Sequence, residues 1–359
     1  MVGGGIIGLS IAREVAANGH SVLLLERGET GEGASWAAAG MLAPQSEADQ
    51  SGPFYELCAA SQAMYRGWAG RLQQESGVDL EYVESGLLFL APTEACLSAL
   101  QQRTGWQRAA GLPLTALSEE ETRELEPSIT MPLAGALLMP NEHQVTPRRV
   151  AQALRAMCKV DIRTSEEVHE IMHDGRRVTG VRTDKGVIPA SIVVLAAGAW
   201  TAQIQGLQPQ IPVSPRKGQI LSLGMPGRTF RHMVRWGRTY AVPRPNGELI
   251  VGATVEDVGF DRNLTPAGVG QLLNAVQEMS KDAARYPIHE MWTGLRPSTP
   301  DELPVLGCGR LSGLIYATGH YRNGVLLAPI TAAIVADLIE DRVPSISLDA
   351  FTPMRQFEV

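Results

Sequence analysis

The first 26 residues combine a glycine-rich turn, a helical apolar pattern and a short apolar run. Gly3-Gly4-Gly5-Ile6-Ile7-Gly8 leads into a helical pattern over 9–17, which Asn18-Gly19 ends. Residues 21–26 follow as a strand-like run that closes on an acid. This order predicts the second half of a βαβ unit. Only Met1-Val2 precede the glycines, where about five strand residues are expected, so either the numbering begins inside the natural protein or the first strand is truncated.

Helical and strand-like patterns alternate along the rest of the chain. An amphipathic pattern predicts a helix at 54–76, and capped helix starts lie at Ser118 and at Thr146-Pro147. Two more helices are predicted at 94–110 and 266–281. Short runs typical of strands occupy 80–91, 161–164, 168–173, 178–183, 187–190, 192–196, 220–223, 239–243, 249–254 and 315–319.

A largely apolar run lies near the C-terminus, from Gly324 to Ile339. It is shorter than a membrane span, and Pro329 and Asp337 interrupt it. We therefore expect a buried helix here and no membrane span.

Composition narrows the possible classes of protein. With 359 residues, the chain is long enough for one large domain or two moderate domains with a full core. Hydrophobic residues make up 44% and charged residues 19%, so the chain is neither disordered nor fibrous. A net charge of −7 gives no general attraction to nucleic acid or to an anionic membrane surface. An anionic small molecule would therefore need a local cation inside the protein.

The four cysteines give no sign of a metal site. Cys58, Cys96, Cys158 and Cys308 are far apart and form no metal-ligand spacing, so we expect reduced thiols and no bound metal. The N-terminus has neither a basic stretch ahead of an apolar run nor a small-residue cleavage site. Together these features favour a cytoplasmic protein.

The glycine-rich turn has the spacing of a dinucleotide site. Gly3, Gly5 and Gly8 form a GxGxxG pattern, in which glycines allow a tight turn, backbone approach to a pyrophosphate and close helix–strand packing. Glu26 lies 18 residues beyond Gly8, where an acid can accept hydrogen bonds from both ribose hydroxyls. The combination predicts dinucleotide binding and leaves FAD and NAD open.

Four further segments carry a resemblance to a known family. Ala34 to Leu42 (ASWAAAGML) is a small-residue stretch that would let backbone lie against a flat ring, and Thr318 to Pro329 (TGHYRNGVLLAP) resembles the C-terminal flavin segment of the D-amino acid oxidase superfamily. With Gly294 to Pro300 (GLRPSTP) and Tyr240 to Arg244 (YAVPR), the chain resembles most closely the glycine oxidases, a family of the thiamine pathway. The similarity covers essentially the whole chain.

The resemblance implies an α/β fold with a glutathione-reductase-type FAD-binding domain and a mixed or antiparallel-sheet substrate domain. The alternation of elements favours the same interrupted arrangement. We expect the FAD-binding domain to comprise 1–78, 140–213 and 294–359, and the substrate-binding domain to comprise 79–139 and 214–293. The family also implies non-covalent FAD and a homotetramer.

Carried over position by position, the resemblance implies a set of FAD contacts. Ile6 and Ile7 would lie at the pyrophosphate turn, Glu26 and Arg27 at the adenosine ribose, and Val168 at the adenine end. The flavin side would be lined by Ala34, Ser35, Ala39, Gly40, Met41, His320, Tyr321, Arg322, Asn323, Gly324, Val325 and Leu326.

Three residues are candidates for binding substrate. Arg296 lies between glycine and proline in a run poor in charge, and a guanidinium offers a carboxylate a two-pronged partner; a structural arginine holding a loop is the alternative. Tyr240 could donate a hydrogen bond to the same carboxylate, or be a core tyrosine. The resemblance implies that Arg322 contacts substrate or flavin. His320 could act as a base, but a packing or flavin-contact role is equally open.

The resemblance implies hydride transfer from the α-carbon of a small amino acid, with glycine leading, to flavin N5. The imino acid would then hydrolyse, and dioxygen would accept the electrons. Other interpretations stay open. A D-amino acid or amine dehydrogenase would pass electrons to a quinone or partner subunit. A covalent sarcosine-oxidase-like flavoprotein fits less well, because Cys308 lies away from where that family attaches its flavin. A non-catalytic flavin-binding protein would not need Arg296 and Tyr240.

Overall fold

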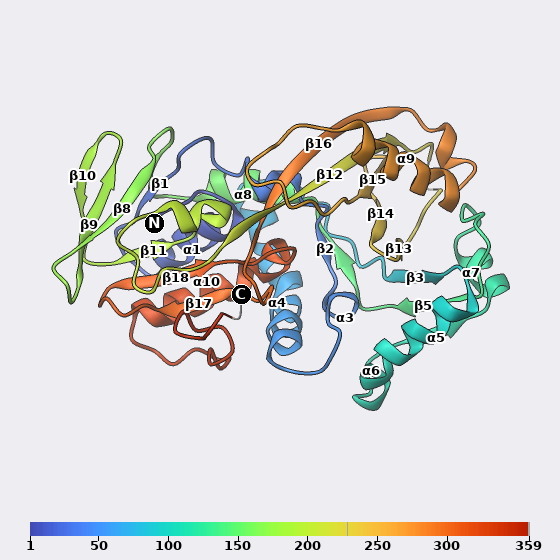
Figure 1. Cartoon of the computed structure of the whole chain (residues 1–359), viewed down its shortest axis with the longest axis horizontal. Coiled ribbons are helices and arrows are strands. Elements are labelled where there is room, and N and C mark those ends of the chain that lie inside the picture. The colour runs from blue at the N-terminus through green and yellow to red at the C-terminus, as the bar shows by residue number, and fades with distance from the viewer. Residues whose placement is uncertain (228, 358–359) are drawn as a thin grey trace.

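The computed structural model describes residues 1–227 and 229–357 and shows two sheet-based halves joined by long strands (Figure 1). Strands β12 (Ser214–Gly224) and β16 (Ile288–Ser298) pair with one another and extend between the halves. The mixed α/β architecture confirms the predicted fold class.

The first half contains a parallel sheet in which one residue takes the place of a strand. β1 (Leu23–Leu25) pairs in parallel with β7 (Asp161–Arg163). β11 (Val193–Leu195) pairs in parallel with β18 (Leu314–Thr318), which pairs antiparallel with β17 (Val305–Cys308). Val2 forms parallel bridges to both Leu25 and Leu195, so it holds the position between β1 and β11 that a longer first strand would occupy.

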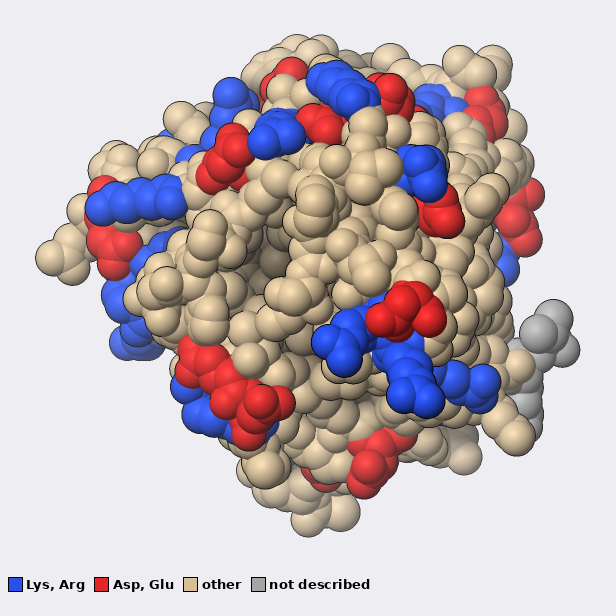
Figure 2. All heavy atoms as spheres, turned by 90° about the vertical axis from the view of Figure 1, so that its left-hand side faces the viewer, with Lys and Arg blue, Asp and Glu red and all other residues tan. Residues whose placement is uncertain are grey.

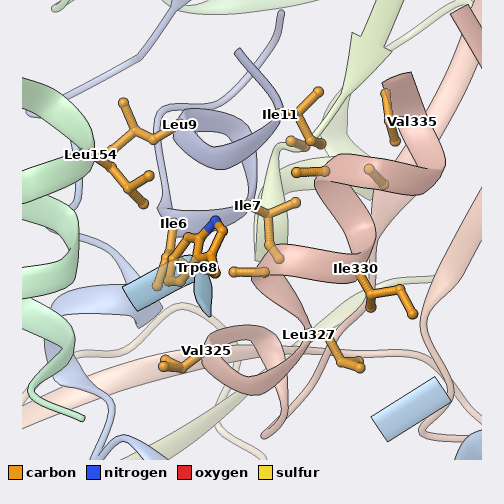
Figure 3. Close-up of a cluster of buried hydrophobic side chains, with 14 of the residues drawn as sticks. Ile6, Ile7, Leu9, Ile11, Trp68, Leu154, Val325, Leu327, Ile330 and Val335 are labelled. Carbon is orange, nitrogen blue, oxygen red and sulfur yellow. The ribbon is translucent and has the colours of Figure 1, made fainter. Parts of the chain in front are cut away.

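Helices cover this sheet and bury its apolar face. α1 (Ile6–Ala17) packs against α10 (Gly324–Ile339), and α4 (Pro53–Ser76) and α8 (Pro147–Met157) pack alongside. Figure 3 shows the shared core, with Ile6 of α1 beside Trp68, Ile7 beside α10, and Leu9 beside Leu154 of α8. Burial of most of α10 confirms the buried helix expected there. Among the described residues, no helix has the length and apolar character needed to cross a bilayer.

The second half is built on an eight-stranded mixed sheet. Its strand order is β16-β12-β15-β14-β13-β3-β5-β4, and β13 and β3 are the parallel pair within it. Its remaining strands are β15 (Glu248–Gly252), β14 (Thr239–Pro243), β13 (Met233–Trp236), β3 (Leu87–Ala91), β5 (Gly135–Met139) and β4 (Thr115–Leu117). α9 (Pro266–Met279) packs on β12 and β15, with Leu272 and Val276 in the core.

Smaller elements complete the fold. A separate antiparallel sheet has the order β10-β9-β8, and Figure 2 shows acidic and basic side chains lying next to one another on the face at this end of the molecule. The bounds of these elements are β8 (Val168–His173), β9 (Val178–Thr183), β10 (Gly186–Pro189), α2 (Ala34–Ala37), β2 (Met41–Leu42), α3 (Pro44–Glu47), α5 (Glu94–Arg103), α6 (Gly105–Ala109), α7 (Glu119–Leu125) and β6 (His143–Gln144).

The structure corrects several expected elements. The strand expected over 80–91 is limited to 87–91, and the helix expected over 94–110 divides at Thr104. The sequence did not predict β5, β13, β16 or β17. β5 and β13 are short and almost wholly buried, so they lack the alternation that marks a half-exposed strand.

Candidate active site

A cavity of about 610 Å³ is lined by residues from both halves of the molecule. Its wall runs from the start of α1 and the Glu26 region to Tyr240 and Arg296 on the large sheet. This volume is within the range of about 300–1,000 Å³ that is usual for ligand pockets.

Glycines at the start of α1 bring backbone to the cavity wall. Gly3 has φ +102°, and a Cβ atom there would lie 2.3 Å from the carbonyl oxygen of Ala196. A Cβ atom on Gly8 would lie 1.9 Å from the carbonyl oxygen of Gly3. Gly5 precedes the helix and has no side chain to cap it, while the Ser35 hydroxyl accepts a hydrogen bond from the Ile6 amide at 2.9 Å. This turn therefore presents a helix N-terminus, which favours a phosphate group.

The Glu26 carboxylate fixes the same turn. Its Oε2 accepts a hydrogen bond from the Gly4 amide at 2.6 Å, and its Oε1 accepts one from the Gly28 amide at 2.9 Å. Each carboxylate oxygen keeps a second lone pair, so these bonds leave acceptor capacity for a ligand hydroxyl.

Arg27 and Val168 line the cavity beside Glu26. The Arg27 guanidinium lies 4.6 Å from the ring centroid of Trp200 and forms an ion pair with Glu167 at 3.4 Å. Val168 is buried at the start of β8. Trp200 therefore joins this end of the cavity, although sequence reasoning did not select it.

The start of α10 also lines the cavity. Asn323 precedes the helix without a side-chain cap, so the first-turn amides of a second helix N-terminus face this region. His320 is buried, and its Nε2 lies 3.1 Å from the Thr331 hydroxyl. Burial lowers the pKa of the His320 imidazole to about 3, so the ring is neutral near pH 7 and is a weak base.

Arg244 ties the small-residue stretch to the large sheet. Its guanidinium donates hydrogen bonds to the carbonyl oxygen of Val145 at 2.7 Å, to Gln144 Oε1 at 3.2 Å and to the carbonyl oxygen of Ala39. Burial lowers the pKa of Arg244 to about 10, which still leaves it charged near neutral pH. Gly40 and Met41 directly follow Ala39 and line the cavity.

Arg296 and Tyr240 lie close together at the large-sheet end. Arg296 is on β16, where its Nη1 donates a hydrogen bond to the Thr254 carbonyl at 3.2 Å. Tyr240 is on β14, and a Cβ atom on Gly252 would lie 2.4 Å from its hydroxyl oxygen. Burial raises the pKa of the Tyr240 phenol, and the positive charge of Arg296 opposes that shift. The phenol is therefore protonated and can donate a hydrogen bond.

A carboxylate that sequence reasoning missed lies in the same cavity. Glu47, at the end of α3, forms ion pairs with Arg235 at 3.0 Å and with Arg322 at 3.2 Å. Burial raises the pKa of the Glu47 carboxyl, but Arg322 and Arg235 outweigh it, so the pKa falls below its ordinary value. Glu47 is therefore ionised. No local motif marks it, because both partners are remote in the sequence.

The structure places most of the selected residues on one wall or another of this cavity. Gly8 and Leu326 are not among its lining residues: Gly8 packs against the carbonyl group of Gly3, and Leu326 of α10 lies in the hydrophobic core. The selected residues that line the cavity are Gly3, Gly5, Ile6, Ile7, Glu26, Arg27, Ala34, Ser35, Ala39, Gly40, Met41, Val168, Tyr240, Arg296, His320, Tyr321, Arg322, Asn323, Gly324 and Val325.

Other lining residues were not selected. Ala196, Ala197 and Gly198 follow the carboxyl end of β11, and the rule that α/β sheets bind ligands at this edge could have identified them. Within the described part of the chain, no cysteine lines the cavity, and no group of His, Cys, Asp and Glu side chains is arranged to hold a metal ion.

Comparison with known proteins identifies the family. The family model described as FAD dependent oxidoreductase (DAO) matches residues 1–338. The chain belongs to this family. The lining of the cavity fits FAD, because it includes two helix starts whose N-cap residues make no side-chain cap, the glycine turn that a Cβ atom would fill, and the Glu26 carboxylate.

Individual relatives extend this result. Glycine oxidase from Geobacillus kaustophilus is 36% identical over 99% of this chain and 96% of that protein, and its crystal structure superposes with a TM-score of 0.95 over 99% of this chain and 98% of that chain. Glycine oxidase from Pseudomonas aeruginosa is 35% identical over 98% of this chain and 97% of that protein. These matches confirm the resemblance to glycine oxidases inferred from the motifs.

Some relatives are longer. The bifunctional protein ThiO/ThiG of Nostoc sp. is 37% identical over 95% of this chain, which covers 52% of that protein. The chain thus spans about half the length of such curated relatives.

Proposed function

We propose that this protein catalyses the FAD-dependent oxidative deamination of glycine and other small amines. Glycine, dioxygen and water would yield glyoxylate, ammonia and hydrogen peroxide: the α-carbon loses a hydride, the amine loses a proton, and the resulting imine is hydrolysed. The observation that carries the proposal is the pairing of Arg296 and Tyr240 at one end of the FAD cavity.

The two side chains suit a substrate carboxylate. Among the described residues, no carboxylate lies within 4.0 Å of the Arg296 guanidinium, so its charge is available to a ligand. The Tyr240 phenol is held in its protonated form beside it and can donate to the same group. A carboxylate fixed in this way orients the adjacent α-carbon toward the flavin, which is alignment rather than acid–base catalysis.

The FAD contacts follow from the cavity walls. When bound, FAD supplies the hydride acceptor at N5. We infer that the α1 turn and Ser35 hold the pyrophosphate region, and that Glu26 accepts hydrogen bonds from the ribose hydroxyls. The amides at the start of α10 would lie near the pyrimidine edge of the flavin and stabilise negative charge there. Since His320 is neutral and bonded to Thr331, we assign it to packing rather than to proton transfer.

We infer the domain bounds, pathway, oligomeric state, cellular location and electron acceptor from the relatives. The FAD-binding domain would comprise 1–78, 140–213 and 294–359, and the substrate-binding domain 79–139 and 214–293. The relatives named as glycine oxidases and as ThiO/ThiG support a place in thiamine biosynthesis. A homotetramer in the cytoplasm, with dioxygen as electron acceptor, completes the proposal.

Flavin reduction tests the reaction directly. Purified holoprotein is mixed anaerobically with glycine, N-methylglycine, D-alanine or buffer, and the absorbance of oxidised flavin is followed. We expect glycine to bleach the flavin, and admission of air to restore the colour with release of peroxide. Bleaching without peroxide would indicate a dehydrogenase that uses another acceptor. Absence of bleaching by every amine would contradict the proposal. Acid precipitation should leave the yellow colour in the supernatant, as non-covalent FAD requires.

A further inference from the structure

The arginines around the substrate end of the cavity differ in whether they have a carboxylate partner. Arg235 and Arg322 both reach the Glu47 carboxylate, one at each oxygen, whereas Arg296 has no carboxylate partner within the described residues. All four side chains line the same cavity. Glu47 thus forms ion pairs with two of the three arginines and leaves the charge of the third, Arg296, without an ion-pair partner among the described residues.

The contact between Glu47 and Arg322 rests on charge. Glu47 Oε2 is buried and accepts no hydrogen bond, although Arg322 Nη2 lies 3.2 Å away. Arg235 is held more firmly, because its Nη1 also donates a hydrogen bond to the Ser46 carbonyl at 2.8 Å. The Arg322 side chain is 37% exposed, and its Cζ atom lies 5.2 Å from the ring centroid of Tyr321. Loss of the Glu47 charge would therefore release Arg322 before Arg235.

Glu47 also acts on the site of the substrate carboxylate. The Arg296 charge contributes to the lowered pKa of Glu47, and Glu47 in turn contributes to the raised pKa of Tyr240, so the three groups lie within electrostatic reach of one another. A second acidic group on a substrate held at Arg296 would enter the field of Glu47. Like charges at close range in a partly buried site are strongly unfavourable.

We propose that Glu47 is a specificity-determining residue that excludes substrates with a second acidic group. By occupying Arg235 and Arg322, it leaves Arg296 to bind a single carboxylate, and its own charge repels another. This proposal rests on the proposed function, since it concerns which amines reach the same site. Specific binding sites combine attraction of the correct ligand with repulsion of others, and in this site Glu47 would supply the repulsion.

Two matched substrates separate charge from size. Iminodiacetate is glycine with a carboxymethyl group on nitrogen, and N-ethylglycine has a similar length without the second charge. We expect Glu47→Gln to raise the ratio of kcat/KM for iminodiacetate over N-ethylglycine by about tenfold or more, because Arg322 becomes available and the repulsion is lost. An unchanged or lower ratio would overturn the proposal.

Asp49→Asn is the matched control. Asp49 lies two residues beyond Glu47, carries the same charge and pairs with Arg103 at 2.5 Å, but it is largely exposed. Exposed pairs are screened by water, so this variant should leave the ratio within about twofold of the wild type. An equal effect of both variants would mean that general charge, and not Glu47, sets the preference.

Arg322→Met tests the same ion pair and should change the ratio of kcat/KM values in the opposite direction. Removing this cation leaves the Glu47 charge less neutralised, so the ratio should fall below that of the wild type. This variant keeps a partner for the buried Arg235 and therefore avoids the unpaired buried charge that could destabilise Glu47→Gln. A ratio that stays the same in Arg322→Met would contradict the proposal even if Glu47→Gln does not fold.

Ligand binding distinguishes this inference from the proposed reaction. Acetate and malonate are titrated into the wild type and Glu47→Gln, with the change in flavin absorbance as the signal. We expect the affinity for malonate to rise relative to acetate in the variant. If no amine reduces the flavin, the proposed function fails while this comparison still decides the role of Glu47. Parallel changes for both ligands would show that Glu47 has only a structural role.

Discussion

The guanidinium of Arg296 occupies the space that a side chain at Gly218 would need. A Cβ atom on Gly218 would lie 2.5 Å from both Nη1 and Nη2 of Arg296. The two residues are diagonal neighbours across the antiparallel pair of β12 and β16, because Gly218 is opposite Gly294 and Arg296 is opposite Arg216. The small residue on one strand therefore sets the position of the cation on the other.

Gly218→Ala should displace Arg296 without removing it. Since misplacement of a binding group by about 1 Å can lower rates a hundredfold, we expect kcat/KM for glycine to fall by about ten- to a hundredfold. Flavin content should stay the same. Gly270→Ala in α9 is the control, because no atom lies within 4 Å of the added methyl group and alanine favours a helix. Equal activity of the two variants would show that Arg296 does not depend on Gly218.

Arg296→Ala should remove the carboxylate partner altogether. Loss of one member of a partly buried charge pair typically costs about 3–5 kcal/mol, so kcat/KM for glycine should fall by about a hundredfold or more. Arg296→Lys should recover only part of the activity, because an ammonium cannot reproduce the two-pronged contact. Steady-state kinetics and flavin content are the measurements. Near-normal kcat/KM in Arg296→Ala, with failure of Tyr240 or Arg322 variants, would place the carboxylate elsewhere.

Glu26→Ala should weaken FAD retention and leave the chemistry of bound flavin unchanged. The substitution removes the proposed ribose acceptor and also frees the amides of Gly4 and Gly28, which loosens the turn. Titration of apoprotein with FAD measures the affinity, and anaerobic reduction of the saturated variant measures the chemistry. Glu14→Ala, on α1 away from the cavity, is the control. An affinity equal to that of the control would remove Glu26 from the site.

Local chemistry made the cofactor turn predictable from sequence. The spacing of Gly3, Gly5 and Gly8 expresses a requirement for bare backbone, and the structure shows the reason at Gly3 and Gly8, where a Cβ atom would overlap a carbonyl oxygen. Helix α10 was predictable as well, since its apolar composition leaves burial as the favourable state.

Contacts between distant segments were not predictable in the same way. Glu47 meets Arg235 and Arg322 only after three remote segments come together, and a lone glutamate in a loop-like stretch carries no signal for that. The role of Gly218 likewise depends on pairing between β12 and β16. Arg296 was found through its motif, although the strand that carries it was not predicted.

Glu142 offers a test of burial that is independent of activity. It lies in the turn between β5 and β6, is fully buried, and accepts a hydrogen bond from the Gln45 amide at 2.7 Å through Oε1, whereas Oε2 has no partner. Burial raises the pKa of the Glu142 carboxyl well above its usual value; the hydrogen bond from Gln45 opposes the shift, and the charge of Glu47 adds to it. Folding therefore favours the protonated form of this group.

The sign of the resulting pH dependence follows from proton linkage. Because the folded pKa is above the unfolded one, the folded state binds more protons in the window between them, and stability falls as pH rises through that window by up to about 1.4 kcal/mol per pH unit. Glu142→Gln keeps the acceptor oxygen for Gln45 and cannot ionise. Its thermal unfolding midpoint should therefore rise relative to that of the wild type as the pH increases above the unfolded pKa of about 4.3. Glu56→Gln, an exposed acid on α4, should show the wild-type pH dependence. If Glu142→Gln follows that same curve, Glu142 is ionised in the folded protein and the burial argument is wrong.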